Sequence, residues 1–168
     1  ISLCALSKFA SALDLFHESL KGAESNEQWE LMALCHIYIG LCHEVANLPI
    51  KCRSELEIAR KIIAEHQLST VIPIFSVRYS SYYRIYDNID SAKYFANLAV
   101  NSSDSTTSLR TIADAYFLLG VLEIDPFKSI QYDRNSIEAY LKSNNFLGAG
   151  NLTIILAKKY FDIGKVDE

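Results

Sequence analysis

A pattern of residue sizes recurs about every forty residues, and this period limits the possible folds more than any other feature of the sequence. A large residue followed by a small one occurs three times at a step of forty, at Ile39-Gly40, Tyr79-Ser80 and Leu119-Gly120. Two further sets of small residues keep the same step, one at Ala12, Cys52 and Ala92 and one at Ser19, Ala59 and Ala99. A fixed period of this length is typical of stacked supersecondary units, so the sequence predicts repeated helix pairs.

Small residues at a fixed step have a physical reason. Where two helices cross closely, a large side chain would hold the backbones apart, so Gly, Ala, Ser or Cys lies at the contact. The fourth unit keeps this pattern at Ser129 and Ser136, but the step from Ala92 and Ala99 is thirty-seven. The fifth unit opens at Leu156-Ala157, again thirty-seven residues after its counterpart. The second helix of the fourth unit and the first helix of the fifth unit thus show the same step of thirty-seven. The three missing residues therefore fall in the link between Gly120 and Asp125-Pro126.

Apolar residues at a spacing of about 3.6 dominate the chain and predict helices throughout. We expect helices at residues 9–22, 26–46, 50–66, 71–86, 89–101, 106–123, 126–143 and 146–163. The one stretch where a strand competes is 71–75, and Pro73 counts against a strand and fits the first turn of a helix. For the helix starts we expect a capping box at Ser25 with Gln28, an N-cap at Ser105, and Asp125 as N-cap before Pro126.

Composition excludes several classes of protein. Half of the 168 residues are hydrophobic and 21% are charged, which favours a packed core over disorder. The net charge of −4 lacks the concentrated basic surface that binding DNA or RNA through this segment would require. No run of about twenty apolar residues is present, so we expect no membrane span.

Cysteine and histidine residues are the candidates for chemistry. Cys4, Cys35, Cys42 and Cys52 all lie in apolar helical pattern, and we expect buried free thiols in a cytoplasmic protein. A disulfide from Cys4 or Cys52 to another helix stays open as an alternative. Cys35-His36 and Cys42-His43 offer ligand types suited to zinc, but their separations of one, six, seven or eight do not put ligands on one helix face. We therefore expect no metal site and no cofactor. His43 with a carboxylate from a neighbouring helix is a possible proton-transfer pair, while Glu55 and Glu57 fit a solvated face.

The spacing resembles the tetratricopeptide repeat. In that family the first helix of each pair carries a large residue, then glycine, then an aromatic residue three positions later. Gly40 and Gly120 fill the glycine position here, and Tyr83 and Tyr160 fill the aromatic one. Asp133 stands where the second helix of the fourth unit should have an aromatic residue. The longer period is similar to the variety found in sensor regions of bacterial transcription regulators and signalling proteins.

This resemblance implies an all-α fold, a right-handed superhelical stack of antiparallel helix pairs. It implies a single array over residues 1–168, with a half unit at 1–22, units at about 26–66, 71–101 and 106–143, and a half unit at 146–164. We expect the chain to be part of a longer protein. The final helix carries more apolar residues than one neighbour can cover, so we expect it to dock onto further repeats, a flanking domain or a second copy in a homodimer.

The resemblance also implies where a partner binds, because the first helix of each pair lines the concave side of such arrays. The positions that correspond are Leu34, Ile37, Leu41, Glu44, Ile74, Val77, Ser81, Arg84, Asp114, Phe117, Val121, Ile124, Asn151, Ile154, Lys158 and Phe161. The alternative is that these residues pack together as core. We expect a scaffold or sensor module that binds a protein or peptide within a larger regulatory protein. A structural spacer between domains and a helical enzyme domain stay open as alternatives.

Overall fold

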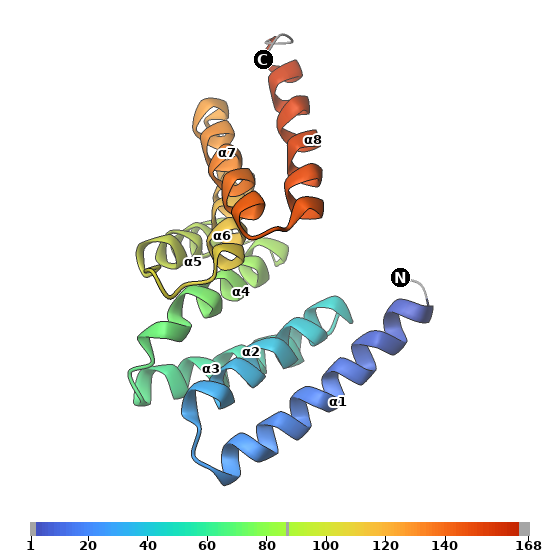
Figure 1. Ribbon diagram of the computed structural model, residues 1–168, viewed down its shortest axis with the longest axis vertical. Helices are drawn as coiled ribbons and strands as arrows, with labels where there is room; N and C mark the ends of the chain where they lie inside the picture. Colours follow the sequence, from blue (N-terminus) through green and yellow to red (C-terminus); the bar gives the residue numbers. More distant parts are fainter. Residues whose placement is uncertain (1–2, 87, 165–168) are drawn as a thin grey trace. The chain divides into compact units, whose positions relative to one another are not determined.

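The computed structural model describes residues 3–86 and 88–164, and the side chains from residue 10 onward. Within these residues the chain forms eight α-helices, one short 3-10 helix and no strand (Figure 1). The α-helices are α1 Leu3–Ser25, α2 Trp29–Val45, α3 Pro49–Glu65, α4 Ile72–Ile85, α5 Ile89–Asn101, α6 Leu109–Leu122, α7 Pro126–Lys142 and α8 Phe146–Asp162, and the 3-10 helix η1 is Ser69–Val71. The prediction of an all-α fold is confirmed.

The helix starts show where local sequence signals decided the structure. Asp125 caps α7 as predicted, because its side chain accepts hydrogen bonds from the backbone N–H groups of Phe127 and Lys128 at 2.9 and 3.2 Å. Pro73 lies in the first turn of α4, so the competing strand at 71–75 does not form. None of the helices in the described part of the chain combines the length and the apolar composition that crossing a membrane requires.

Two predicted caps and several predicted helix boundaries were wrong. The expected capping box at Ser25 does not form, because α1 continues through Ser25 and α2 starts after Gln28 without a side-chain cap. α1 also begins at Leu3, well before the expected residue 9. The cap of α6 is Ser108 and not Ser105, since the Ser108 hydroxyl accepts from the Thr111 N–H at 3.1 Å. The helix consequently starts three residues later than predicted.

Four of the turns between helices share one backbone conformation. Residues just after a helix adopt left-handed φ angles of 52–57° at Glu27, Asn47, Gln67 and Asn144, and Gly164 follows α8 with a φ of 76°. After α2, for example, the Asn47 N–H donates to the Glu44 carbonyl at 3.0 Å and the Leu48 N–H to the His43 carbonyl at 2.9 Å. These bonds satisfy carbonyls that a helix end leaves free and reverse the chain within three residues.

The chain divides into two compact units, Ile1–Arg78 and Tyr79–Glu168, and α4 contributes residues to both. In the first unit α2 packs against α1 on one side and α3 on the other. Cys35 and Ile39 of α2 pack with Leu20 of α1, while a parallel stack of the Trp29 and His66 rings, with centroids 4.1 Å apart, closes the end of the α2–α3 pair. Burial of the apolar stripes of these helices stabilises the unit.

In the second unit α6 packs between α5 and α7, and α8 packs on α7 (Figure 1). The small residues predicted at the crossings are buried there, except for Ala157 of α8, which is exposed. Ala92, Ala96 and Ala99 of α5 are fully buried, and the buried Ser80 hydroxyl donates to the Ala92 carbonyl at 2.8 Å. The hydroxyl of a small residue thus reaches the backbone of the next helix, which confirms the physical reason for small residues at these positions.

Candidate binding surface

α8 is held on α7 by one apolar face and one polar network. Ala149 and Leu152 of α8 are buried and pack with Ala113 of α6 and with Ala139 and Tyr140 of α7. Farther along α8, Arg134 of α7 donates a hydrogen bond to the Tyr160 hydroxyl, and its guanidinium carbon lies 5.6 Å from the centre of the Tyr160 ring. These contacts fix which side of α8 faces the protein and which side faces outward.

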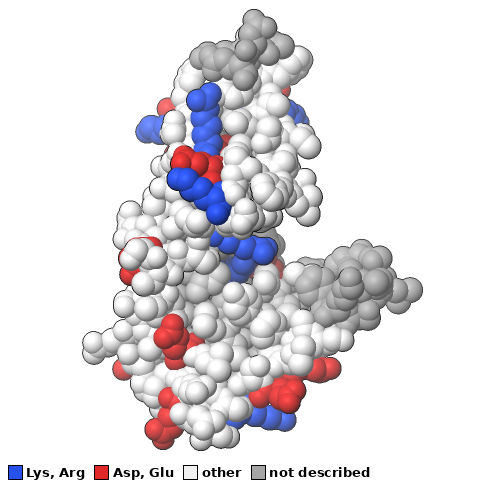
Figure 2. Space-filling view, viewed as in Figure 1, with Lys and Arg blue, Asp and Glu red and all other residues white. Residues whose placement is uncertain are grey.

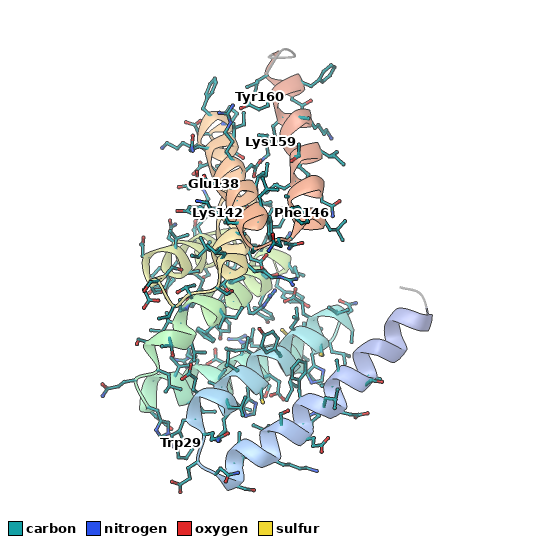
Figure 3. All side chains as sticks on the ribbon, in the orientation of Figure 1. Trp29, Glu138, Lys142, Phe146, Lys159 and Tyr160 are labelled. Carbon is teal, nitrogen blue, oxygen red and sulfur yellow. The ribbon has the colours of Figure 1, made fainter. Side chains whose placement is uncertain are left out.

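The polar network joins three helices around the fully buried carboxylate of Asp133. The Lys159 ammonium of α8 donates to Asp133 Oδ2 at 2.6 Å, to the Ser129 hydroxyl at 2.7 Å and to the Gly120 carbonyl at 3.2 Å (Figure 3). The Ser129 hydroxyl in turn donates to the Gly120 carbonyl at 2.6 Å. Since a buried charge requires a partner of opposite sign, this arrangement ties the position of α8 to the α6–α7 pair.

Burial dominates the electrostatics of Asp133. Removal from water raises the pKa of the Asp133 carboxyl, and the hydrogen bond and positive charge of Lys159 oppose this rise. The second oxygen, Oδ1, has no hydrogen-bond partner among the described residues. It points at Gly120, where a Cβ atom would lie only 2.3 Å from it. In the repeat pattern Asp133 is only a misfit, at a position where an aromatic residue is expected. A lysine on the buried side of the following helix was the available signal for its partner.

Part of the outward side of α8, beside the exposed Asn151 and Lys158, is apolar and uncovered. Leu147, Ile154 and Phe161 follow one another at steps of seven residues, and their side chains are 76%, 72% and 68% exposed. Phe146, Gly150, Thr153 and Ala157 are exposed on the same side. We call these seven residues the open face of α8. Figure 2 shows that the surface over α8 on the viewed side is largely free of acidic and basic atoms.

A cleft lies between α6 and α7 in the same unit. Its volume is about 320 Å³, and it is lined by Leu109, Ile112, Tyr116, Asn135, Glu138, Ala139 and Lys142. Glu138 and Lys142 form an exposed ion pair at 2.7 Å, one helical turn apart on α7 (Figure 3). The size and mixed lining suit one side chain of a partner or a small ligand. No feature of the sequence pattern indicates this cleft.

The positions predicted for a concave face fall into three groups by exposure. Ile37 and Val77 are buried in the core. Leu34, Leu41, Glu44, Ile74, Ser81, Arg84, Asp114 and Phe117 are half-buried, and the Tyr140 hydroxyl donates to Asp114 Oδ1 at 2.6 Å. Val121, Ile124, Asn151, Ile154, Lys158 and Phe161 are exposed. The structure thus brings Asn151, Ile154, Lys158 and Phe161 together along the outward side of α8, two of them on its open face.

Three of the four cysteines lie in environments that suppress thiol chemistry, and the side chain of Cys4 lies outside the described residues. Cys35, Cys42 and Cys52 are free and buried, as predicted. Burial raises the pKa of each thiol, and at Cys52 burial together with the negative charges of Glu44 and Glu55 raises the pKa to about 12. Because the thiolate is the nucleophile, these thiols stay protonated and unreactive near neutral pH.

The histidine within hydrogen-bonding distance of a carboxylate is His36, whereas the sequence suggested His43. Glu55 does not lie on a solvated face, because its Oε2 is 2.7 Å from Nδ1 of the half-buried His36. Burial lowers the pKa of His43, and the Glu55 charge opposes this. Among the side chains that the structure describes, no three His, Cys, Asp or Glu groups come close enough to hold a metal ion. The His36–Glu55 pair links α2 and α3.

None of the known protein-family models matches this chain, and no curated protein matches it.

Proposed function

We propose that this chain is a protein-binding module built from helical repeats, and that a partner protein docks on the open face of α8. The observation that supports this most directly is the row of three large apolar side chains, Leu147, Ile154 and Phe161, which are all more than two-thirds exposed. Burying a side chain of this kind contributes about 1.5–3 kcal/mol. An exposed apolar row that is continuous along a helix is typical of an interaction surface.

Binding is favoured over catalysis by what the reactive groups do in the fold. The described thiols are buried and protonated, His36 is engaged with Glu55, and Lys159 with Asp133. The His36–Glu55 and Lys159–Asp133 pairs each link neighbouring helices. The resemblance to tetratricopeptide repeats agrees with a scaffold or sensor role within a larger regulatory or signalling protein, and buried free thiols favour a cytoplasmic setting.

The proposal is tested by selecting a phage-displayed library of helical and extended peptides against the chain. We expect the binding of the selected peptides to weaken about tenfold or more when Ile154 is replaced by Glu, because a charge on the open face prevents its burial. Fluorescence anisotropy with the labelled peptides measures the change.

The matched control is Ile50→Glu, which places the same charge at an 85% exposed isoleucine of α3. This variant should bind the selected peptides like the unaltered chain. Circular dichroism of both variants checks that the helices are intact. Peptides that bind equally to the Ile154→Glu chain would show that the open face of α8 is not the docking surface.

A further inference from the structure

Two helices that begin a repeat, α2 and α6, carry a matching pair of small residues, and α8 carries it as well, whereas α4 has Pro73 and Ser80 at these positions. The pair is Ala33 and Gly40 on α2, Ala113 and Gly120 on α6, and Gly150 and Ala157 on α8, seven residues apart each time. Residues seven apart lie on one face of a helix, separated by two turns. α8 is therefore built like α2 and α6.

On α2 and α6 this pair is the contact with the next helix. A Cβ atom at Gly40 would lie 3.4 Å from the Leu56 side chain and 3.5 Å from the Cys52 carbonyl, both in α3. On α6, a Cβ atom at Gly120 would lie 3.4 Å from the Ser129 carbonyl of α7. The Ser136 hydroxyl of α7 reaches the Ala113 carbonyl at 2.8 Å. The small residues thus let the backbone of a second helix approach closely.

The pair on α8 has no such neighbour among the described residues. A Cβ atom added at Gly150 would meet nothing within 4 Å, and Ala157 is exposed. The buried residues Ala149, Leu152 and Tyr160 are those that face α7 and α6. The open face of α8 thus carries the same pair of small residues as the contact faces of α2 and α6, but no helix in the described chain covers it.

The helices that cover α2 and α6 share a spacing of small buried residues. They present small residues seven apart with a third buried residue four after the first. In α3 these are Cys52, Leu56 and Ala59, and in α7 they are Ser129, Asp133 and Ser136. α5 has the same spacing at Ala92, Ala96 and Ala99. Small residues on both helices are what makes the close crossing possible.

We infer that the open face of α8 is a seat for one amphipathic helix of a partner protein, with small residues seven apart and an apolar residue between them. The inference rests on the proposed function and specifies its ligand. The partner helix lies against Gly150 and Ala157 as α3 lies against α2, antiparallel to α8, with Leu147, Ile154 and Phe161 packed along its side. This is recognition of a helix by an apolar helix surface.

A second copy of the chain fits this seat less well. In a symmetric antiparallel pair of α8 helices centred on Ile154, Leu147 faces Phe161 and the two Ile154 side chains face each other. Gly150 then lies opposite Lys158, since the two positions are equally far from the centre. Large side chains therefore meet at three levels and hold the backbones apart. If the pair is instead centred between Thr153 and Ile154, Gly150 lies opposite Ala157, but Leu147 then lies opposite Tyr160, which is buried against α7. Neither register brings together both the small residues and the apolar row.

The experiment uses the full chain and a synthetic probe, the α3 segment of residues 47–66 with Cys52→Ala. A hydrocarbon staple joins positions 61 and 65, which are exposed in α3, so that the free peptide is helical. Fluorescence anisotropy measures binding of the labelled probe to the unaltered chain and to Ile154→Glu, Ala157→Leu and Ala64→Leu. The last is the matched control, an exposed alanine of α3.

We expect Ile154→Glu to remove binding and Ala157→Leu to weaken it about fivefold or more, with Ala64→Leu unchanged. The direction at Ala157 is the decisive readout. Leucine adds apolar surface, so a merely apolar patch would bind tighter, whereas a close helix crossing is obstructed by the larger side chain. The same reason predicts weaker binding of a probe with Ala59→Leu.

The other outcomes separate the two proposals. If Ile154→Glu weakens binding but Ala157→Leu leaves it unchanged or tighter, the helix seat is wrong and the proposed function stands. If neither variant changes binding, or the probe does not bind, the seat is wrong. If light scattering shows a dimer that Ile154→Glu dissociates while the probe does not bind, a second copy occupies the face and the inference is overturned.

Discussion

Gly120 and Asp133 depend on each other. The absence of a side chain on Gly120 leaves the space that Asp133 Oδ1 occupies, and the Gly120 carbonyl accepts from both Ser129 and Lys159. A position that the repeat pattern describes only as small is thus part of a charged network. The glycine is needed here because of a close approach, since any Cβ atom would meet the carboxylate.

We expect Gly120→Ala to destabilise the chain by about 1–3 kcal/mol, because the new Cβ forces Asp133 to move in a packed core. The matched control is Gly150→Ala on the open face of α8, where nothing lies within 4 Å. Alanine there should stabilise by about 1 kcal/mol through its higher helix propensity. Urea unfolding followed by circular dichroism measures both. Equal effects at the two glycines would contradict the close contact.

Lys159→Met should destabilise by about 3 kcal/mol near pH 7.5, because it leaves the Asp133 charge buried without a partner. Burial already raises the pKa of Asp133, and the variant loses the Lys159 charge that opposed this. A carboxyl group whose pKa is higher in the folded state than its unfolded value of about 3.9 stabilises the fold at pH values below about 3.9. This stabilisation is lost as the pH rises through the pKa of the folded state. The deficit relative to the unaltered chain should therefore shrink near pH 4.5.

The control for this pH effect is Lys142→Met, which removes an exposed partner of Glu138. Exposed pairs contribute about 0–1 kcal/mol, so this variant should stay close to the unaltered chain at both pH values. A deficit of Lys159→Met that is the same at pH 7.5 and 4.5 in urea unfolding would show that Asp133 is not the group responsible.

The sequence predicted the small residues at the helix crossings but not the network built on them. The periodicity of residue size predicts which positions lie where helices cross, and this prediction was right at Gly40, Gly120, Ser129 and Ser136. The pairing of Asp133 with Lys159 joins residues twenty-six apart whose side chains meet only through the rotation of α8 on α7. That rotation follows from packing of three helices at once, which no local pattern encodes.

At the scale of elements, the 3.6-residue period was a reliable guide to the existence of helices and a poor one to their ends. α7 starts where predicted because Asp125-Pro126 is a strong local signal. α1 extends beyond both predicted ends, and α6 starts at Leu109 although Ser105 offered an earlier cap. Several hydroxyl residues precede α6, so the sequence offers several caps and the structure uses one.

We expect Ser108→Ala to destabilise by about 1 kcal/mol, because the Thr111 N–H then loses its capping acceptor. Ser105→Ala, an exposed serine outside the helix, should change the free energy of unfolding by less than about 0.5 kcal/mol. Thermal unfolding of the two variants compares them directly. A larger effect at Ser105 would place the start of α6 where the sequence had predicted it.

At the scale of the whole molecule, the repeat explains why a concave surface could not be read from the sequence. The pattern that identifies a first helix is the same whether its inner residues line a groove or fill a core. Ile37, Val77 and Ile154 hold equivalent positions in the repeat, yet the first two are buried and Ile154 is exposed. Their difference comes from what lies beside each helix. The periodicity of the sequence therefore identifies equivalent positions in the repeat, but the exposure of each position depends on which helices pack beside it.

The stack of Trp29 on His66 gives the protein a built-in optical label. Trp29 is the only tryptophan of the chain, and its ring closes the end of the α2–α3 pair. Of the ten tyrosines, only Tyr38 precedes residue 79, so phenol absorption reports almost entirely on the second unit. Selective excitation of the indole therefore follows the opening of one helix pair in the first unit, and tyrosine circular dichroism follows the second. The melting of the two halves of this repeat protein can be recorded separately in a single unlabelled sample.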